Sequence, residues 1–229
     1  MNVFLSGDSG SGKSTLLLDF LSQSDLEAAG YTTVHLLDQE GRRVAHQLRD
    51  LHLLIHELRQ NLQKDNGFDA WLFAQDSADS ADSADTAVSA YIDAPCFCRL
   101  EEGRMVFFTR LFVEKSLALL RQSPGSDLLV LDEVGGPELL EDDFYAKLLD
   151  MLDSRQALLI VWKNAAGLAH MKLENSLYEA LLERRSRLLD RADQLLICEK
   201  NEKTRRQLMV TLKNDFKRDK SFDKESSSR

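Results

Sequence analysis

The 229-residue chain contains only three cysteines and no long apolar run. Cys96, Cys98 and Cys198 do not make the even-numbered disulfide framework of small secreted proteins, so a reducing compartment is the simpler interpretation. Nowhere do about 18 apolar residues follow one another, as a membrane-spanning helix requires. A strand predicted from Asn2 leaves no room for a cleavable leader. We therefore expect a soluble, cytoplasmic protein without a membrane partner.

Basic residues are also in the minority. The chain has 29 Lys and Arg against 38 Asp and Glu, which gives a formal net charge of −9, and the acidic residues are spread along the sequence. Nucleic-acid-binding proteins need positive charge opposite the phosphates. The composition therefore argues against nucleic acid as the main partner.

Short apolar runs alternate with amphipathic segments along the chain. The spacing predicts strands at residues 3–5, 31–37, 105–108, 128–131, 157–162 and 195–198, and helices at 14–21, 48–62, 111–121, 140–152 and 173–189, followed by a basic helical end. Gly41 can close a turn from the second strand into Val44, which predicts a hairpin. Strands that alternate with helices indicate an α/β domain with a mostly parallel sheet covered by helices on both faces.

Residues 76–87 form a three-residue repeat, DSADSADSADTA, which is too small and acidic to contribute to a core. We interpret it as part of an insertion around residues 65–95 in one domain spanning residues 1–217, followed by a disordered tail at 218–229. The alternative is that this region acts as a lid or that the segment 50–105 contacts a protein partner.

The segment GDSGSGKS, residues 7–14, lies between the first predicted strand and the first predicted helix. Its G-x-x-x-x-G-K-S spacing is typical of a phosphate-binding loop, whose glycines let backbone N–H groups surround a phosphate at a helix N-terminus. Lys13 then reaches the β- and γ-phosphates, and the Ser14 hydroxyl ligates Mg²⁺. This motif predicts a nucleotide site made of Gly7, Asp8, Ser9, Gly10, Ser11, Gly12, Lys13, Ser14 and Thr15.

A second motif, LLVLDEVGG, places two acids directly after a buried strand. Because the carboxyl ends of parallel strands meet at one edge of the sheet, Asp132 can hold Mg²⁺ near Ser14. Glu133 is then placed to orient or deprotonate a water molecule that attacks the γ-phosphate, with Lys13 as the second catalytic residue. Asn164, which with Lys163 ends the following strand, is a candidate γ-phosphate contact.

Several arginines are candidates for stabilising charge in the transition state, and the sequence does not choose among them. They are Arg42, Arg43, Arg110, Arg155 and Arg184.

The combination of GDSGSGKST with LDEVGGPELLEDDF resembles a family of P-loop nucleoside-triphosphatases first typified by a thermophilic enzyme, in which Asp-Glu-Ile-Gly is the second motif. Weaker similarities are GYTT at residues 30–33, GRRV at 41–44 and LLICEKNEKTRRQL at 195–208. The resemblance implies a RecA-like P-loop fold and Mg²⁺-dependent hydrolysis of ATP, GTP and related triphosphates with broad base tolerance. Two alternatives stay open: a small-molecule kinase or phosphotransferase, and a slow nucleotide-binding module that signals or assembles.

Overall fold

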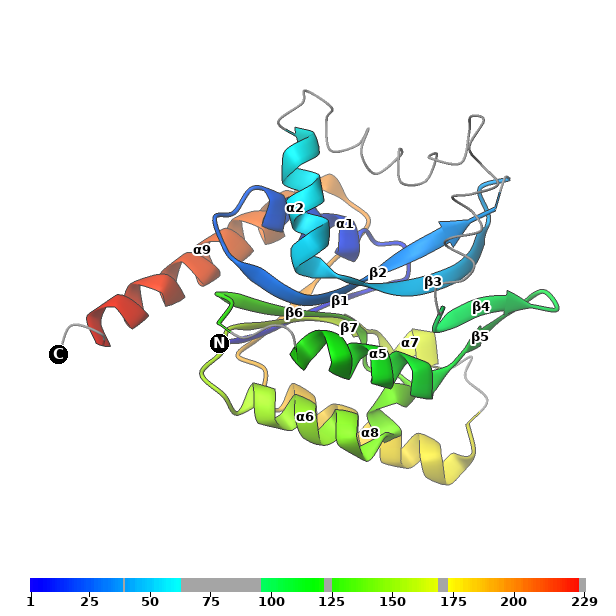
Figure 1. Cartoon of the computed structure of the whole chain (residues 1–229). Coiled ribbons are helices and arrows are strands. Elements are labelled where there is room, and N and C mark those ends of the chain that lie inside the picture. Colours follow the sequence, from blue (N-terminus) through cyan, green and yellow to red (C-terminus); the bar gives the residue numbers. More distant parts are fainter. Residues whose placement is uncertain (39, 63–95, 122–124, 169–172, 227–229) are drawn as a thin grey trace.

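The computed structural model of the chain describes every residue except 39, 63–95, 122–124, 169–172 and 227–229 (Figure 1). Its centre is a sheet with the strand order β5-β4-β3-β2-β6-β7-β1-β8. The strands are β1 (Asn2–Gly7), β2 (Ala28–Leu37), β3 (Arg43–Asp50), β4 (Cys98–Glu101), β5 (Arg104–Phe107), β6 (Leu128–Val134), β7 (Leu158–Lys163) and β8 (Gln194–Ile197).

Five neighbouring strands, β2, β6, β7, β1 and β8, run parallel to one another. Strand β7 lies between β1, which leads into the predicted phosphate loop, and β6, which carries the two acids near its end. The carboxyl ends of all five strands therefore meet at one edge, where open α/β sheets bind their ligands.

The other side of the sheet is antiparallel, while the sheet as a whole is mostly parallel, as the sequence predicts. Strand β2 pairs with β3 in the predicted hairpin, and β3 then pairs with β4 and β4 with β5. Strand β4 was not predicted, because four residues with the sequence CRLE carry no clear apolar alternation. Together, β4 and β5 extend the sheet beyond the helices (Figure 1).

Helices cover both faces of the sheet (Figure 1). One face carries α1 (Lys13–Ser22), α2 (Leu51–Leu62) and α9 (Glu202–Ser226), and the other carries α5 (Thr109–Arg121), α6 (Asp142–Leu152) and α8 (Asn175–Leu189). The 3₁₀ turn η1 (Pro137–Leu140) and the short α7 (Ala165–Leu168) follow β6 and β7. Among the described residues, no helix is both long and apolar enough to cross a membrane.

The alternation of side chains along the strands creates a hydrophobic core on each face. In β1, Val3 and Leu5 pack with α1, α2 and α9, while Phe4 packs on the opposite side with Trp162 and the α5, α6 and α8 layer. A strand buried on both faces reads as a continuous apolar run, as the sequence of β1 does. The predicted α/β fold with helices on both faces is thus confirmed.

Two predicted boundaries are corrected by the structure. Leu48 belongs to β3, where it pairs with Thr33, and α2 begins only at Leu51 because Asp50 accepts a hydrogen bond from the Leu53 N–H and ends the strand. Leu140 likewise lies in η1, one turn before α6, because Pro137 starts that separate turn.

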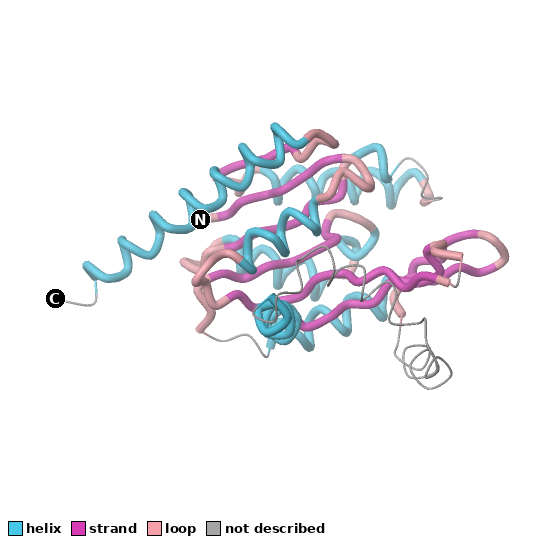
Figure 2. The backbone as a smooth tube through the Cα atoms, turned by 90° about the horizontal axis from the view of Figure 1, so that it is seen from above, coloured by secondary structure: helices cyan, strands magenta, loops and turns pink. Residues whose placement is uncertain are grey.

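The predicted tail also differs from the structure. Helix α9 continues to Ser226 and projects beyond the sheet (Figure 1 and Figure 2), where the sequence predicts disorder from residue 218. The residues before 218 already form the helix, and extending an existing helix costs less free energy than starting one. Residues 227–229 and the predicted insertion around 65–95, with its repeat, lie outside the described residues.

Candidate functional site

The loop between β1 and α1 is held against β8 by close backbone contacts. A Cβ atom at Gly7, where φ is +151°, would collide with the carbonyl oxygen of Cys198, so only glycine fits. The Cys198 thiol donates to the Ser11 carbonyl at 3.4 Å, and α1 begins when Leu16 N–H donates to the Gly12 carbonyl at 2.8 Å. The loop tip, Asp8 to Gly10, is exposed to solvent.

Lys13 folds back over this loop. Its Nζ atom donates to the carbonyl oxygens of Gly7 and Asp8, each at 2.9 Å, so the ammonium group lies over the concave side of the loop. Asn164, from the end of β7, donates to Asp8 Oδ1 at 2.7 Å. The structure therefore brings Asn164 to the tip of the loop. Thr15 lies half-buried in the first turn of α1.

Asp132 is completely buried at the end of β6. Its Oδ2 atom accepts hydrogen bonds from the Thr32 hydroxyl and the Thr33 N–H, both at 2.9 Å, and its Oδ1 atom accepts from the Glu133 N–H at 2.9 Å. The Ser14 hydroxyl lies 3.5 Å from Oδ2. The two predicted metal ligands, 118 residues apart in the chain, thus face each other.

Thr32 and Thr33 were not predicted as site residues. They come from β2, whose residues pair with β6 up to Tyr31 and Leu131. The available signal is that Thr32 and Thr33 follow a run of buried residues in an interior strand. A threonine buried in such a strand needs a polar partner for its hydroxyl group.

The surroundings of Asp132 fit a divalent cation. Burial, and next the neighbouring charge of Glu133, raises the pKa of Asp132 to about 6 against the lowering effect of its three hydrogen bonds. A buried carboxylate opposite a hydroxyl is a donor set that suits Mg²⁺, which in proteins binds one or two such oxygens together with water and substrate phosphates. Among the described residues there is no cluster of three or more His, Cys, Asp or Glu side chains that would hold a metal without such a substrate.

Glu133 occupies a bulge in β6. Leu131 pairs with Ile160 and Val134 with Trp162, so two residues of β6 stand opposite the single residue Val161. Glu133 adopts a left-handed conformation with φ of +63° there, a strain of roughly 1–3 kcal/mol for a residue with a side chain. In a regular strand adjacent side chains point to opposite faces, and the bulge interrupts this alternation at Asp132 and Glu133.

Lys163 holds the Glu133 side chain. Its Nζ atom lies 3.5 Å from Glu133 Oε2 and 3.9 Å from Oε2 of the fully buried Glu138, and it is 4.7 Å from the centre of the Phe107 ring. Burial alone would raise the pKa of Glu133, but the charge of Lys163, together with the smaller effects of His46, His35 and Lys13, outweighs it and holds that pKa below its ordinary value. Glu133 is therefore kept ionised.

Glu138 and Arg185 fix the turn that follows Glu133. Glu138 Oε1 accepts from the N–H groups of Gly135 and Gly136, both at 2.6 Å. Arg185 donates to the carbonyl oxygens of Gly135 and of Lys163, and lies 4.6 Å above the Trp162 ring. Arg185 is not among the predicted site residues, although its position four residues after Leu181, on the apolar face of α8, is a signal for a buried arginine.

The candidate arginines do not converge on this edge. Arg42 pairs with Asp38 and Glu40, Arg110 pairs with Glu114, and Arg184 binds the Leu139 carbonyl and Asp142. Arg43 and Arg155 are exposed. No described contact joins any of these five arginines to Lys13, Ser14 or Glu133.

Comparison of the sequence with models of protein families finds no match, and comparison with curated proteins finds none either. Among solved structures, the chain is similar to the solution structure of a human cancer-related nucleoside triphosphatase. The two are 17% identical with a TM-score of 0.51, and the alignment covers 93% of this chain and 95% of that one. The likeness extends over nearly the whole of both chains and supports the fold of a nucleoside triphosphatase.

Proposed function

We propose that the protein hydrolyses nucleoside triphosphates such as ATP and GTP to the diphosphate and phosphate, in a Mg²⁺-dependent reaction. One observation carries the proposal: a carboxylate that faces the serine of the phosphate loop and a second, ionised carboxylate next to it lie at the same edge of the sheet. The nucleoside triphosphatase fold of the similar human protein supports the same class of reaction.

In this proposal, each residue of the loop and of the neighbouring strand ends has its own role. The backbone of residues 7–14 and the N-terminus of α1 bind the β- and γ-phosphates. Lys13 exchanges its loop carbonyls for phosphate oxygens, and Asn164 contacts the γ-phosphate from the end of β7. Mg²⁺ held by Ser14 and Asp132 would supply charge neutralisation for the phosphate oxygens.

Glu133 performs the step that distinguishes hydrolysis from binding. Its ionised carboxylate accepts a hydrogen bond from a water molecule, orients it in line with the γ-phosphate and takes its proton as the new P–O bond forms. The bond from the γ-phosphorus to the bridging oxygen breaks, and the diphosphate leaves. Lys163 keeps the carboxylate directed and charged until then.

The test compares the wild-type chain with Glu133→Gln for phosphate release from ATP, GTP, CTP, UTP and deoxynucleoside triphosphates with Mg²⁺. Loss of the base should lower turnover by about 10²- to 10⁴-fold while nucleotide binding is retained. Near-normal turnover in the variant would refute the hydrolase mechanism. If an added acceptor then stimulated nucleotide consumption, the protein would instead be a kinase or phosphotransferase.

A further inference from the structure

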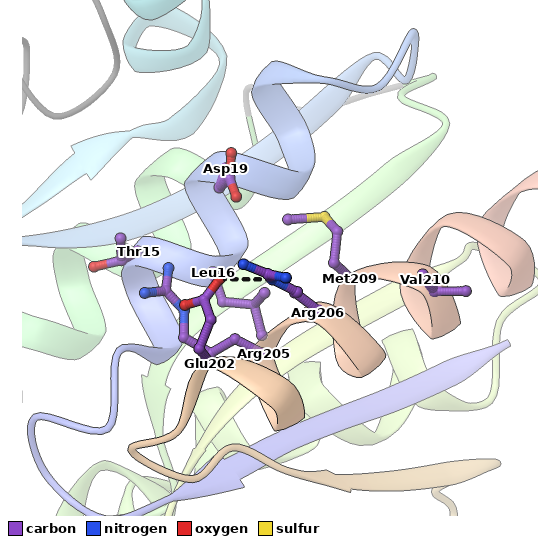
Figure 3. Close-up of a pocket in the computed structure, with 8 residues that line it drawn as sticks. All are labelled: Thr15, Leu16, Asp19, Glu202, Arg205, Arg206, Met209 and Val210. Carbon is purple, nitrogen blue, oxygen red and sulfur yellow. Dashed lines mark hydrogen bonds and ion pairs between the residues drawn. The ribbon is translucent and has the colours of Figure 1, made fainter.

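A groove lies between α1 and the start of α9, on the face of the sheet that also carries α2 (Figure 3). Its volume is about 530 Å³, within the roughly 300–1,000 Å³ range of small-molecule sites. It is lined by Thr15, Leu16 and Asp19 from α1 and by Glu202, Arg205, Arg206, Met209 and Val210 from α9.

The groove adjoins the phosphate loop directly. Thr15, which lines it, follows Ser14 in the chain. Arg205 reaches the loop itself, because its Nε atom lies 4.0 Å from the position of a Cβ atom at Gly12. Lys200, from the connection between β8 and α9, comes within 3.9 Å of the same position at Gly10. A ligand that leaves the loop on this side thus passes Arg205 into the groove.

The order of the strands indicates which way a triphosphate bound to the loop would point. Asp132 and Glu133 follow β6, which lies two strands from β1 on one side, whereas α9 follows β8, the neighbour of β1 on the other side. A triphosphate whose γ-phosphate lies toward Glu133 therefore has its opposite end toward α9. The groove is where the part of the molecule beyond the α-phosphate would lie.

The lining has the chemistry that a nucleoside needs. Leu16 forms a buried floor, and the half-buried Met209 side chain points across the groove toward α1 (Figure 3). The planar guanidinium of Arg206, held by Glu202 at 3.0 Å, can stack on a base. Asp19 adds a carboxylate that accepts hydrogen bonds from sugar hydroxyls or amino groups.

We propose that this groove binds the nucleoside part of the triphosphate, chiefly by stacking of the base. Stacking tolerates every base, because each has a π-face, so ATP and GTP should both use the groove. The inference rests on one part of the proposed function, namely that the loop of residues 7–14 holds the phosphates.

The test measures binding, without hydrolysis, of ATP, GTP and inorganic tripolyphosphate by isothermal titration calorimetry with Mg²⁺. Tripolyphosphate carries the phosphate chain without a nucleoside. The variant Arg206→Ala should bind ATP and GTP about 5- to 150-fold more weakly than the wild-type chain and tripolyphosphate equally well.

A matched control is Arg187→Ala on α8. Arg187 pairs with Glu183, as Arg206 pairs with Glu202, four residues apart on an exposed helix surface, but on the opposite face of the sheet. This variant should bind all three ligands as the wild type does. Circular dichroism checks that both variants are folded.

Three results would overturn the assignment of the groove: unchanged ATP and GTP affinity in Arg206→Ala, an equal loss for tripolyphosphate, or the same loss in Arg187→Ala. The proposed function fails in other ways. Binding of ATP without phosphate release would refute hydrolysis and leave the groove assignment standing, whereas no binding of any of the three ligands by the wild-type chain would refute both.

Discussion

The ammonium group of Lys163 lies 3.5 Å from the carboxylate of Glu133, although the two residues come from strands β7 and β6. Lys163 is itself enclosed. Burial lowers its pKa, but the carboxylates of Glu138 and Glu133 outweigh this effect and raise the pKa above its usual value, so the side chain stays charged. The residue that we propose as the base is therefore held by a largely buried cation that also pairs with Glu138.

Replacing Lys163 with methionine keeps the aliphatic length and removes the charge. We expect kcat for triphosphate hydrolysis to fall, by up to about 100-fold, because the Glu133 carboxylate loses its orientation. KM should change little, since the phosphate loop is intact. The exposed Lys147 of α6 provides a matched control, and Lys147→Met should leave both constants unchanged. A loss confined to KM would show that Lys163 binds substrate instead of positioning Glu133.

Asp132→Asn preserves the size of the buried side chain and removes its charge. If Asp132 holds Mg²⁺, the variant should bind the Mg²⁺–triphosphate complex more weakly. Loss of a residue that only supports a metal ligand lowers metal affinity by roughly 10- to 100-fold, and we expect at least this loss here. Titration of Mg²⁺ into variant and wild type at fixed nucleotide measures this. Asp150→Asn, an exposed change on α6, serves as the control. An unaltered Mg²⁺ requirement in Asp132→Asn would contradict the assignment.

His46 should make the fold sensitive to acid. Burial, and next the charge of His35, whose ring centre is 4.3 Å away, lowers the pKa of His46 to about 4. The unfolded chain, with a pKa of about 6.5, binds the proton more readily, so stability falls as the pH drops from about 6.5 toward 4. Between pH 7 and 5 this one group should cost about 2 kcal/mol of unfolding free energy.

Urea unfolding of His46→Gln at pH 7, 6 and 5 tests this dependence. The variant should lose less stability than the wild type over that range, whereas His52→Gln, an exposed change on α2, should follow the wild type. Identical pH dependence in all three proteins would refute the contribution of His46.

The Asp-Ser-Ala repeat should be dispensable for hydrolysis. Its small polar residues offer no core, and the free energy of loop closure depends only weakly on loop length. A chain lacking Asp76 to Ala87 should unfold at nearly the same urea concentration and retain its turnover. If such a chain folds but no longer releases phosphate, the repeat acts as a lid.

The loop of residues 7–14, the position of Asp132 and the parallel core could be predicted because each depends on one contiguous stretch of sequence. GDSGSGKS between a strand and a helix predicts a loop at the helix N-terminus, and an apolar run followed by an acid indicates that the carboxyl end of a strand is near. The meeting of Ser14 with Asp132 follows from topology alone, since both leave parallel strands at the same edge.

The other features of the candidate site depend on contacts between distant parts of the chain, which no local sequence pattern predicts. Thr32 binds Asp132 from a strand 100 residues earlier, and the role of Lys163 depends on a bulge in the strand beside its own. Phe107, which covers Lys163, comes from a four-residue strand at the edge of the sheet. Two acids after Leu131 are typical of the end of a strand, so no local pattern predicts that β6 continues to Val134.

The bulge in β6 also changes which face of the sheet each following side chain points to. In a regular strand, every second side chain returns to the same face, so odd and even positions are separated. The extra residue reverses this parity: Leu131 and Val134, three residues apart, both pack in the core with α5, α6 and α8. Loss of one residue between them would restore the regular alternation and leave Val134, then two positions after Leu131, facing the same core. Val134 would thus reach the core with or without the extra residue, and what the bulge adds is a second acid between Leu131 and Val134.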